Sequence, residues 1–435
     1  MYISKKKSLW VMLLLIVALP VFSTALAQTD DPSTCNVEAP ESPTTINFLA
    51  WAGLSILFYN DEFAKCNEVE NLEFDAQILD FTGVTEQFRL ALSAGGASPY
   101  QIVHASNTEI VEWGSAGWLL PLNDLIDNYR AEYDLDDHSA TAWEGATIDG
   151  QVYGIPFRAN TLHLWYRSDL FEQYDLEPPT TYDEVMAACE DLKDEPSINL
   201  PFTMQVHAGW AWEFRFFSFI RSFGGDYLND DNTPAFNGSE GVTAATKIKE
   251  VIDACMGPEG ITYSIDDSAN GLANGTIAFI HTWAGQGAIF EDPDTSNVVG
   301  LIESAPAAAP NPGGLLGGSA WHDYFIIPVT NEVDPDLVFR LIMEATDKQS
   351  QEEGAKIQPM TRLSVPQYLA NAAAINETIA HGVGIYDANP AVVLAQTALW
   401  NWLPFIGTGE MTPQEALDGA AAEYIAEATI QGYLP

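Results

Sequence analysis

Hydrophobic and polar positions recur along this chain with two different spacings, which predict strands and helices in alternation. Residues 46–51 form a mainly apolar run that suits a buried strand, and residues 72–78 carry an apolar side chain at every second position. Residues 85–94 then place apolar side chains at helical spacing, and a short strand is expected at residues 101–104. Strand–helix–strand units of this kind predict a mostly parallel sheet with helices on both faces.

The same alternation continues through the second half of the sequence. Thr181 and Glu184 form a capping box before an apolar stripe, and residues 242–255 carry a second stripe at helical spacing. Further strands are expected at residues 277–280, 298–302 and 324–329, and further helices after Asp334 and Thr412. The pattern therefore predicts an α/β protein with at least two lobes.

The first residues have the three parts of a secretory signal peptide. Residues 5–7 are lysines, residues 9–19 are an apolar run, and residues 25–27 are Ala-Leu-Ala. The run is shorter than the roughly 20 residues that a membrane span needs. We therefore expect a signal peptide over residues 1–27, cleaved after Ala27. Because no Cys adjoins that site, we expect neither a lipid anchor nor membrane insertion.

The charge balance excludes several classes of partner. The chain has 17 Lys and Arg against 61 Asp and Glu, a formal net charge of −44. Nucleic-acid binding needs clustered cations, and so does docking on anionic lipid, so neither partner is expected. An acidic surface of this strength would be tolerated best in saline water, because salt screens the repulsion.

Four cysteines in an exported chain predict two disulfides. Three pairings are possible. We favour Cys35–Cys66 and Cys189–Cys255, because the second two cysteines lie on apolar stripes of neighbouring helices. A zinc site is a poor alternative, since no Cys-x-x-Cys spacing exists and no His is close in sequence.

Most enzyme motifs are absent from the sequence. It has no phosphate loop, no dinucleotide-binding glycine pattern, no His-Glu-x-x-His and no Gly-x-Ser-x-Gly. We therefore expect no catalytic residue, metal or cofactor. Two alternatives stay open, because a glycoside hydrolase needs only two carboxylates and the acidic loop at residues 226–232 could bind calcium.

Tryptophan placement is the most informative feature for function. Trp51 ends the first expected strand, and Trp283 follows the one at residues 277–280. Trp210 and Trp212 follow a strand-like stretch at residues 202–206, and Trp321 follows a glycine-rich loop. Ligands of open α/β sheets bind beyond the carboxyl ends of the strands. Indole rings there could cover the apolar faces of a sugar while polar side chains bind its hydroxyls, although each Trp could also simply pack under a loop.

Five segments of the chain resemble those of a known family, both in their amino-acid sequence and in their order along the chain. Read together, they resemble the extracellular solute-binding proteins of carbohydrate ABC importers, of the maltose-binding type. The segments are DGQVYGIP at 149–156, LWYRSDLF at 164–171, PPTTYDEV at 178–185, NGTIAFIHTW at 274–283 and TPQEAL at 412–417.

The resemblance implies a two-lobed periplasmic-binding-protein fold with a ligand cleft between the lobes. Each lobe is expected to hold a mostly parallel sheet flanked by helices. A flexible leader is expected at residues 28–43. Lobe 1 is expected to comprise residues 44–157 and 285–330, and lobe 2 residues 158–284 and 331–435. The chain is expected to cross between the lobes near residues 158–161, 283–287 and 330.

The resemblance also implies ligand-binding residues. His207 and Ala208 stand where the maltodextrin binders commonly have an acid and a Pro, which leaves a monosaccharide, disaccharide or polyol open beside an oligosaccharide. The positions that match the family's cleft are Trp51, Arg158, Asn160, His207, Trp210, Trp212, Trp283 and Trp400. Loop position and side-chain chemistry add Asp80, Asn107, Trp321, Asp323 and Arg362.

The function implied by the resemblance is capture of a neutral sugar or polyol by lobe closure in the periplasm. The expected partners are the carbohydrate, a membrane permease and its ATPase subunits, and the chain is expected to be a monomer. Three alternatives remain. They are a binding protein for an anionic solute that uses Arg158, Arg167 and Arg362, a secreted glycoside hydrolase, and a purely structural surface protein.

Overall fold

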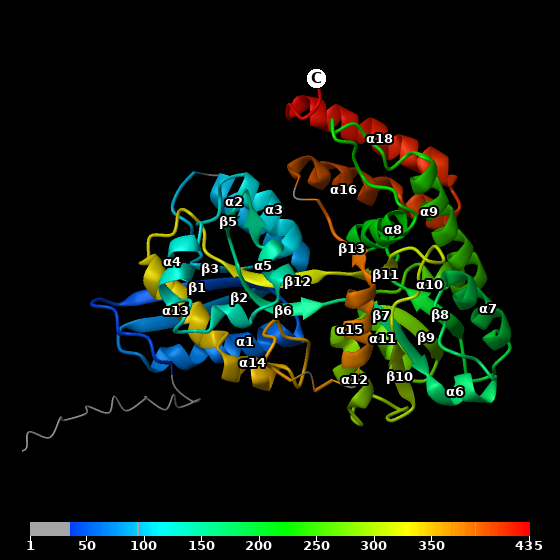
Figure 1. The fold of residues 1–435 in the computed structure, drawn as a ribbon, viewed down its shortest axis with the longest axis horizontal. Helices are drawn as coiled ribbons and strands as arrows, with labels where there is room; N and C mark the ends of the chain where they lie inside the picture. Colours follow the sequence, from blue (N-terminus) through cyan, green and yellow to red (C-terminus); the bar gives the residue numbers. More distant parts are fainter. Residues whose placement is uncertain (1–34, 94, 367, 370, 388) are drawn as a thin grey trace, which may run out of the picture. The chain divides into compact units, whose positions relative to one another are not determined.

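The computed structural model describes residues 35–93, 95–366, 368–369, 371–387 and 389–435 (Figure 1). The expected signal peptide and its cleavage site lie outside these residues. Two main sheets organise the described chain, a five-stranded sheet of order β2-β1-β3-β12-β6 and a four-stranded sheet of order β10-β7-β9-β8. Each sheet is flanked by its own helices, so the predicted two-lobed α/β fold is confirmed.

The first sheet begins with the strands that the hydrophobic pattern predicts. Strands β2 and β3 both pair in parallel with β1, whereas β12 runs antiparallel between β3 and β6. The strands are β1 (Thr44–Trp51), β2 (Leu72–Leu79), β3 (Ile102–Ser106), β6 (Ile155–Asn160) and β12 (Trp321–Ile326).

The second sheet is more antiparallel than expected. Strand β8 pairs in parallel with β9, but β7 is antiparallel to both β9 and β10. The expectation of mostly parallel sheets is therefore wrong in detail, because β7 continues directly from β6 and β12 enters the first sheet without a preceding crossover helix. The strands are β7 (Leu162–Arg167), β8 (Leu200–Met204), β9 (Ile277–Trp283) and β10 (Ile302–Ala305).

Helices cover both sheets, and short strands and turns connect them. Beside the first sheet lie α1 (Leu54–Ala64), α2 (Phe81–Ser93), α3 (Asn107–Ser115), α4 (Asn123–Tyr129), α5 (Ala140–Glu144), α13 (Pro335–Ala345) and α14 (Lys348–Gly354), with η1 (Lys65–Glu68), η2 (Leu135–Asp137), β4 (Thr147–Ile148) and β5 (Gln151–Val152). Beside the second lie α6 (Ser168–Gln173), α7 (Tyr182–Leu192), α8 (Trp210–Ser222), α9 (Ser239–Val251), η3 (Ile252–Met256), α10 (Gly257–Gly260), α11 (Ile265–Ala273), η4 (Ala284–Gln286), α12 (Gly287–Glu291), β11 (Leu316–Ser319), α15 (Ala372–His381), β13 (Val383–Gly384), α16 (Pro390–Trp402), α17 (Pro404–Thr408) and α18 (Pro413–Ile430).

Packing divides the chain between the lobes differently from the expected boundaries. Strand β10 pairs with β7 and α12 packs on α11, so both belong with the second sheet. Helix α13 instead packs on α1 and buries its apolar stripe, including Val338 and Ile342, in the core of the first lobe. By this packing, the chain passes from one sheet to the other between β6 and β7, between β11 and β12, and after α14.

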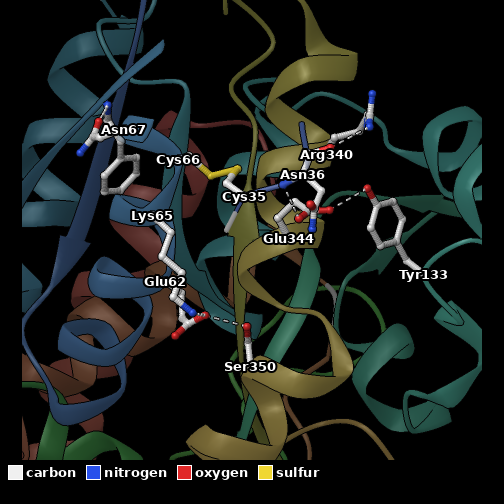
Figure 2. The surroundings of a disulfide bond; sticks show 11 residues. Cys35, Asn36, Glu62, Lys65, Cys66, Asn67, Tyr133, Arg340, Glu344 and Ser350 are labelled. Atoms are coloured by element: carbon white, nitrogen blue, oxygen red, sulfur yellow. Dashed lines mark hydrogen bonds and ion pairs between the residues drawn. A yellow bond between two sulfur atoms is a disulfide. The ribbon is translucent and has the colours of Figure 1, made fainter. Parts of the chain in front are cut away.

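Both predicted disulfides are confirmed. Cys35 bonds to Cys66 and Cys189 bonds to Cys255, with Cα–Cα distances of 4.9 and 5.4 Å. Figure 2 shows that the first bond ties the start of the described chain to the first lobe, where the Asn36 amide also donates to Glu344 Oε2 at 2.9 Å. The leader, expected to be flexible up to residue 43, is thus anchored from Cys35 onward.

Candidate functional site

Strand pairing gathers several predicted site residues at the junction of the two sheets. Strand β12 sets Trp321 opposite Asn160 and Asp323 opposite Arg158. On the other side of the crossing, β7 sets Leu162 opposite Trp283 at the end of β9. Residues that lie far apart in the sequence thus meet where the chain passes from one lobe to the other.

Asp323 is the centre of an ionic cluster at this junction. Its side chain is fully buried, it forms an ion pair with Arg158, and its Oδ1 accepts hydrogen bonds from His104 Nε2 at 3.2 Å and Trp321 Nε1 at 3.2 Å. Burial alone would raise the pKa of Asp323, but the charge of Arg158 and the bond from His104 outweigh it and lower the pKa. We call Asp323, Arg158, His104 and Trp321 the Asp323 cluster.

The last residue of β1 extends this cluster. The Trp51 ring stacks on the His104 ring with a centroid separation of 3.4 Å and an interplanar angle of 23°. Burial lowers the pKa of His104 to about 4, so the imidazole is neutral near pH 7 and its Nε2–H is free to donate to Asp323. The half-buried Trp51 therefore packs on a neutral ring.

Aromatic side chains from the second lobe meet Trp321. Phe214 of α8 lies 5.1 Å from Trp283 and 5.6 Å from Trp321, and the two indoles lie 5.7 Å apart, all between ring centroids. Trp210 and Tyr386 contact Phe214 at 6.4 Å each. These five rings, which we call the aromatic junction, bring the predicted residues Trp210, Trp283 and Trp321 together.

A cavity of about 110 Å³ lies beside the junction. Its walls come from both lobes, and α3 of the first lobe contacts α16 of the second. Of the predicted site residues only Asn107 lines it. The lining residues are Asn107, Thr108, Val111, Thr141, Glu144, Gly145, Thr147, Ala320 and His322 on one side, and Ile385, Tyr386, Asp387, Asn389, Val392, Val393 and Gln396 on the other.

Four predicted residues serve other contacts. Trp212 is 1% exposed and packs in the core of the second lobe, beside Gly407. Arg362 is 2% exposed and donates to the backbone carbonyls of Tyr133, Asp134 and Thr346. Asp80 is exposed and accepts from the Gly83 amide at the start of α2, and the Asn160 side chain accepts from the Thr161 amide.

The remaining two predicted residues flank the aromatic junction. His207 is half-buried with its ring edge-on to Trp210 at a centroid separation of 5.6 Å, and burial lowers its pKa. Trp400, near the end of α16, points its Nε1 to Glu213 Oε2 at 3.4 Å. Both lie close to residues of the junction.

Glu213 is a residue that sequence reasoning missed. It is 2% exposed in α8, and its carboxylate accepts from Tyr227 Oη at 2.6 Å, Tyr386 Oη at 3.0 Å and Trp400 Nε1. Burial raises the pKa of Glu213 to about 7, against the opposing effect of these hydrogen bonds. The available signal was a single acid within the aromatic sequence of residues 210–217.

The three arginines that an anionic ligand would need are already engaged. Arg158 pairs with the buried Asp323, and Arg167 donates twice to Asp169 at 2.7 and 2.6 Å. Arg362 is held by backbone carbonyls and lies 4.0 Å from Asp137. Among the described residues, no group of three or more His, Cys, Asp or Glu side chains is placed to hold a metal ion.

Two α/β lobes, three chain crossings and an aromatic junction beside a cavity between the lobes define a two-lobed binding protein. The family described as "Bacterial extracellular solute-binding protein" matches residues 61–352, and the chain belongs to this family. Within the described residues, no helix is both long and apolar enough to cross a membrane.

Comparison with individual proteins agrees with this assignment. The chain is 31% identical over 132 residues to an uncharacterized ABC transporter extracellular-binding protein of Pyrococcus horikoshii, an alignment that covers 30% of each chain. A solute-binding protein of Agrobacterium radiobacter in complex with ribitol superposes with a TM-score of 0.79 and 22% identity, covering 88% of this chain and 99% of that one. Its counterpart from Agrobacterium vitis with bound D-mannitol gives 0.76 and 21%, covering 89% and 99%.

Proposed function

We propose that this chain is the substrate-binding component of an ABC importer and captures a neutral sugar or polyol. In this proposal the chain is an exported monomer, cleaved after Ala27, that works in the periplasm. It delivers its ligand unchanged to a membrane permease driven by ATPase subunits. The observation that carries the proposal is the aromatic junction at the lobe crossing, next to a cavity with walls from both lobes.

The charge of the site favours a neutral ligand over an anionic one. Arg158 is the cation of the junction, and Asp323 already neutralises it from a fully buried position. A carboxylate or phosphate on the ligand would have to compete with this internal partner and would face Glu144 and Asp387 across the cavity. The ribitol and D-mannitol complexes of the similar proteins, both with neutral polyols, are consistent with this preference.

The lining of the cavity suits a small hydroxylated ligand. Its volume of about 110 Å³ lies below the ~300–1,000 Å³ of sites for drug-sized molecules, which favours a monosaccharide or a polyol over an oligosaccharide. Side-chain amides and hydroxyls of Asn107, Thr108 and Gln396 can bind ligand hydroxyls, while Val111 and Val392 face its carbon atoms. If a ligand lacks one of these hydroxyls, a polar side chain of the cavity is left without a hydrogen-bond partner. This loss costs about 1–3 kcal/mol of binding free energy.

Ligand capture follows from the position of the cavity between the lobes. A ligand that contacts α3 and α16 together stabilises the closed arrangement by the free energy of contacts that an open one lacks. We propose that the lobes move about the three crossings, at residues 160–162, at residues 319–321 and between α14 and α15. The permease would then distinguish loaded from empty protein by shape.

Thermal unfolding against a ligand panel tests the proposal. The panel contains monosaccharides, disaccharides, polyols and uronic acids, and a ligand that binds only the folded chain raises the melting temperature through the term RT ln(1 + [L]/Kd). We expect a rise with one or more neutral compounds and none with uronic acids. A response to the acids alone would overturn the proposal, and so would turnover of an oligosaccharide during incubation, which is the outcome that a glycoside hydrolase predicts.

A further inference from the structure

A buried carboxylate lies directly behind one wall of the cavity. Glu213 projects from α8 into the interior of the second lobe, and Tyr386 Oη donates to its Oε1 at 3.0 Å. The same Tyr386 lines the cavity and belongs to the aromatic junction. A hydrogen bond thus joins the interior carboxylate to the cavity wall.

Glu213 also contacts two residues of the neighbouring helix α16. Trp400 of α16 donates to Oε2, and Gln396, one turn earlier on the same helix, contributes a hydrogen bond that helps to lower the pKa of the carboxyl. Gln396 lines the cavity. The carboxylate therefore connects the segment before α16 and the cavity-facing side of α16, which are both parts of the same wall.

Ring stacking and hydrogen bonds of its hydroxyl group, one of them to Glu213, hold Tyr386 in place. Its ring stacks on Phe217 at a centroid separation of 3.7 Å and an angle of 15°, which fixes the plane of the ring. Because the hydroxyl hydrogen is donated to Glu213, the Tyr386 oxygen has only acceptor capacity left. A carboxylate at position 213 can only accept, so it fixes the direction of this hydrogen bond. A protonated carboxyl group or an amide at the same position can donate, and so can reverse the direction.

We propose that Glu213 is a positioning residue for ligand recognition, acting through Tyr386 and α16 without touching the ligand. This inference rests on the proposed function, because it assigns a role in binding at that same cavity. The inference also predicts that the affinity for ligand depends on the ionisation of Glu213. A carboxylate with a purely structural role would not produce this dependence.

The surroundings of Glu213 make its ionisation measurable near neutral pH. The titratable side chains in contact with its carboxylate are Tyr227 and Tyr386, whose pKa values are raised well above 10 by burial, and Trp400 and Gln396 are uncharged. On the same helix, Arg221 is paired with Asp226, and Arg215 bonds to His281 and Gln205 in the second core. Among the described residues, none forms an ion pair with Glu213.

Tyr227 provides a matched control. Its hydroxyl donates to the same carboxylate oxygen at 2.6 Å, but the side chain is 0% exposed and lies in the core of the second lobe. Tyr227→Phe therefore removes a hydrogen bond to Glu213 from the core side while keeping its ring against Tyr386 at a centroid separation of 6.2 Å. Tyr386→Phe removes the corresponding bond on the cavity side.

The experiment is a set of calorimetric titrations with ribitol and D-mannitol, or with whichever neutral compound gives the largest thermal shift. We expect Glu213→Gln to weaken binding about tenfold or more at about pH 8, and Tyr386→Phe to do the same. In the Tyr386→Phe background, Glu213→Gln should weaken binding less than it does in the wild type, because only the route through α16 is left, whereas Tyr227→Phe alone should change affinity less than about twofold. Wild-type affinity should fall as the pH is lowered from about 8 to about 6, and Glu213→Gln should remove this dependence.

The outcomes separate the inference from the proposed function. If the wild-type chain binds a neutral ligand but Glu213→Gln binds equally well with an unchanged pH profile, the inference is overturned and the proposed function stands. Equal losses from Tyr227→Phe and Tyr386→Phe would also overturn it, since they would indicate general loosening of the core. If Glu213→Gln does not fold, the two tyrosine variants alone decide. A wild-type chain that binds no neutral compound overturns both proposals.

Discussion

The indole of Trp321 donates its Nε1–H to Oδ1 of Asp323 at 3.2 Å. This bond joins the aromatic junction to the Asp323 cluster, so the ring expected to meet the ligand is oriented by a carboxylate that is itself held by Arg158 and His104. Glu213 has a similar relation to Tyr386 in the second lobe. In each lobe, a buried acid therefore accepts a hydrogen bond from an aromatic side chain of the aromatic junction.

Asp323→Asn tests the ionic side of this arrangement. The substitution leaves Arg158 largely buried without a counter-charge, which should lower the free energy of unfolding by about 3–5 kcal/mol in chemical denaturation. It should also shift ligand preference toward sugar acids, because the Arg158 charge is no longer neutralised. Asp169→Asn is the control, since its pair with Arg167 is partly exposed and should cost about 1 kcal/mol or less. Equal costs for the two variants would contradict this account.

Trp210 and Trp212 stand two residues apart and should respond in opposite ways to replacement by Ala. Trp210→Ala alters the half-buried edge of the aromatic junction, so ligand affinity should fall about tenfold while stability changes little. Trp212→Ala empties a core position and should lower the free energy of unfolding by about 3–5 kcal/mol, with affinity retained by the folded fraction. Calorimetry and urea denaturation of both variants provide the comparison, and the reverse pattern would place the site elsewhere.

Removal of either disulfide should lower stability without affecting binding. In the chain-entropy account, bonds that close loops of 31 and 66 residues contribute about 4 kcal/mol each. Neither bond includes a residue that lines the cavity. Double Cys→Ala variants of each pair should therefore unfold at lower denaturant concentration and bind ligand like the wild type. A large loss of affinity in a variant that is fully folded would contradict the placement of the site.

Buried neutral histidines should make the protein less stable in acid. Burial lowers the pKa to about 4 for His104 and His322 and to about 3 for His138 and His163. The unfolded chain binds a proton to each near pH 6.5 while the folded chain does not, so stability falls as the pH is lowered from about 6.5 toward about 4. The acids Glu109 and Glu213, with pKa values raised to about 7, oppose this trend over part of the range.

His163→Gln isolates one of these contributions. It should reduce the pH slope of the unfolding free energy by up to about 1.4 kcal/mol per pH unit between about pH 6 and 4. Urea melts in about 1 M salt are suitable, because screening to about 3 Å suppresses the repulsion among the many surface acids. An unchanged slope for His163→Gln would contradict the neutral state of the buried ring.

The sequence predicted those parts of the fold that local pattern determines. The alternation at residues 72–78 became β2, and the capping box at Thr181 and Glu184 begins α7 as expected. The cysteine pairing was also predictable, because Cys189 and Cys255 lie on apolar faces that must meet in one core. The lobe to which each element belongs was not predictable in the same way, since β10 and α13 could bury their apolar faces against either sheet.

The site was less predictable than the fold. Residues at strand ends, such as Trp51 and Trp283, lie near the junction because strand polarity fixes where they point. Within a helix, by contrast, Trp210 and Trp212 lie on different faces, and only packing decides that the second is core. Arg362 was chosen for its charge, but its donors are taken by carbonyls of a distant loop that no local pattern reveals.

The central claim is that this cavity binds a neutral hydroxylated ligand. The most direct test is a calorimetric titration of the wild-type chain with ribitol and D-mannitol, each set against its own sugar acid, at one pH and one salt concentration. The account predicts measurable binding of a neutral polyol and at least about tenfold weaker binding of the acid. Tighter binding of the acid, or chemical conversion of the polyol during the titration, would contradict it.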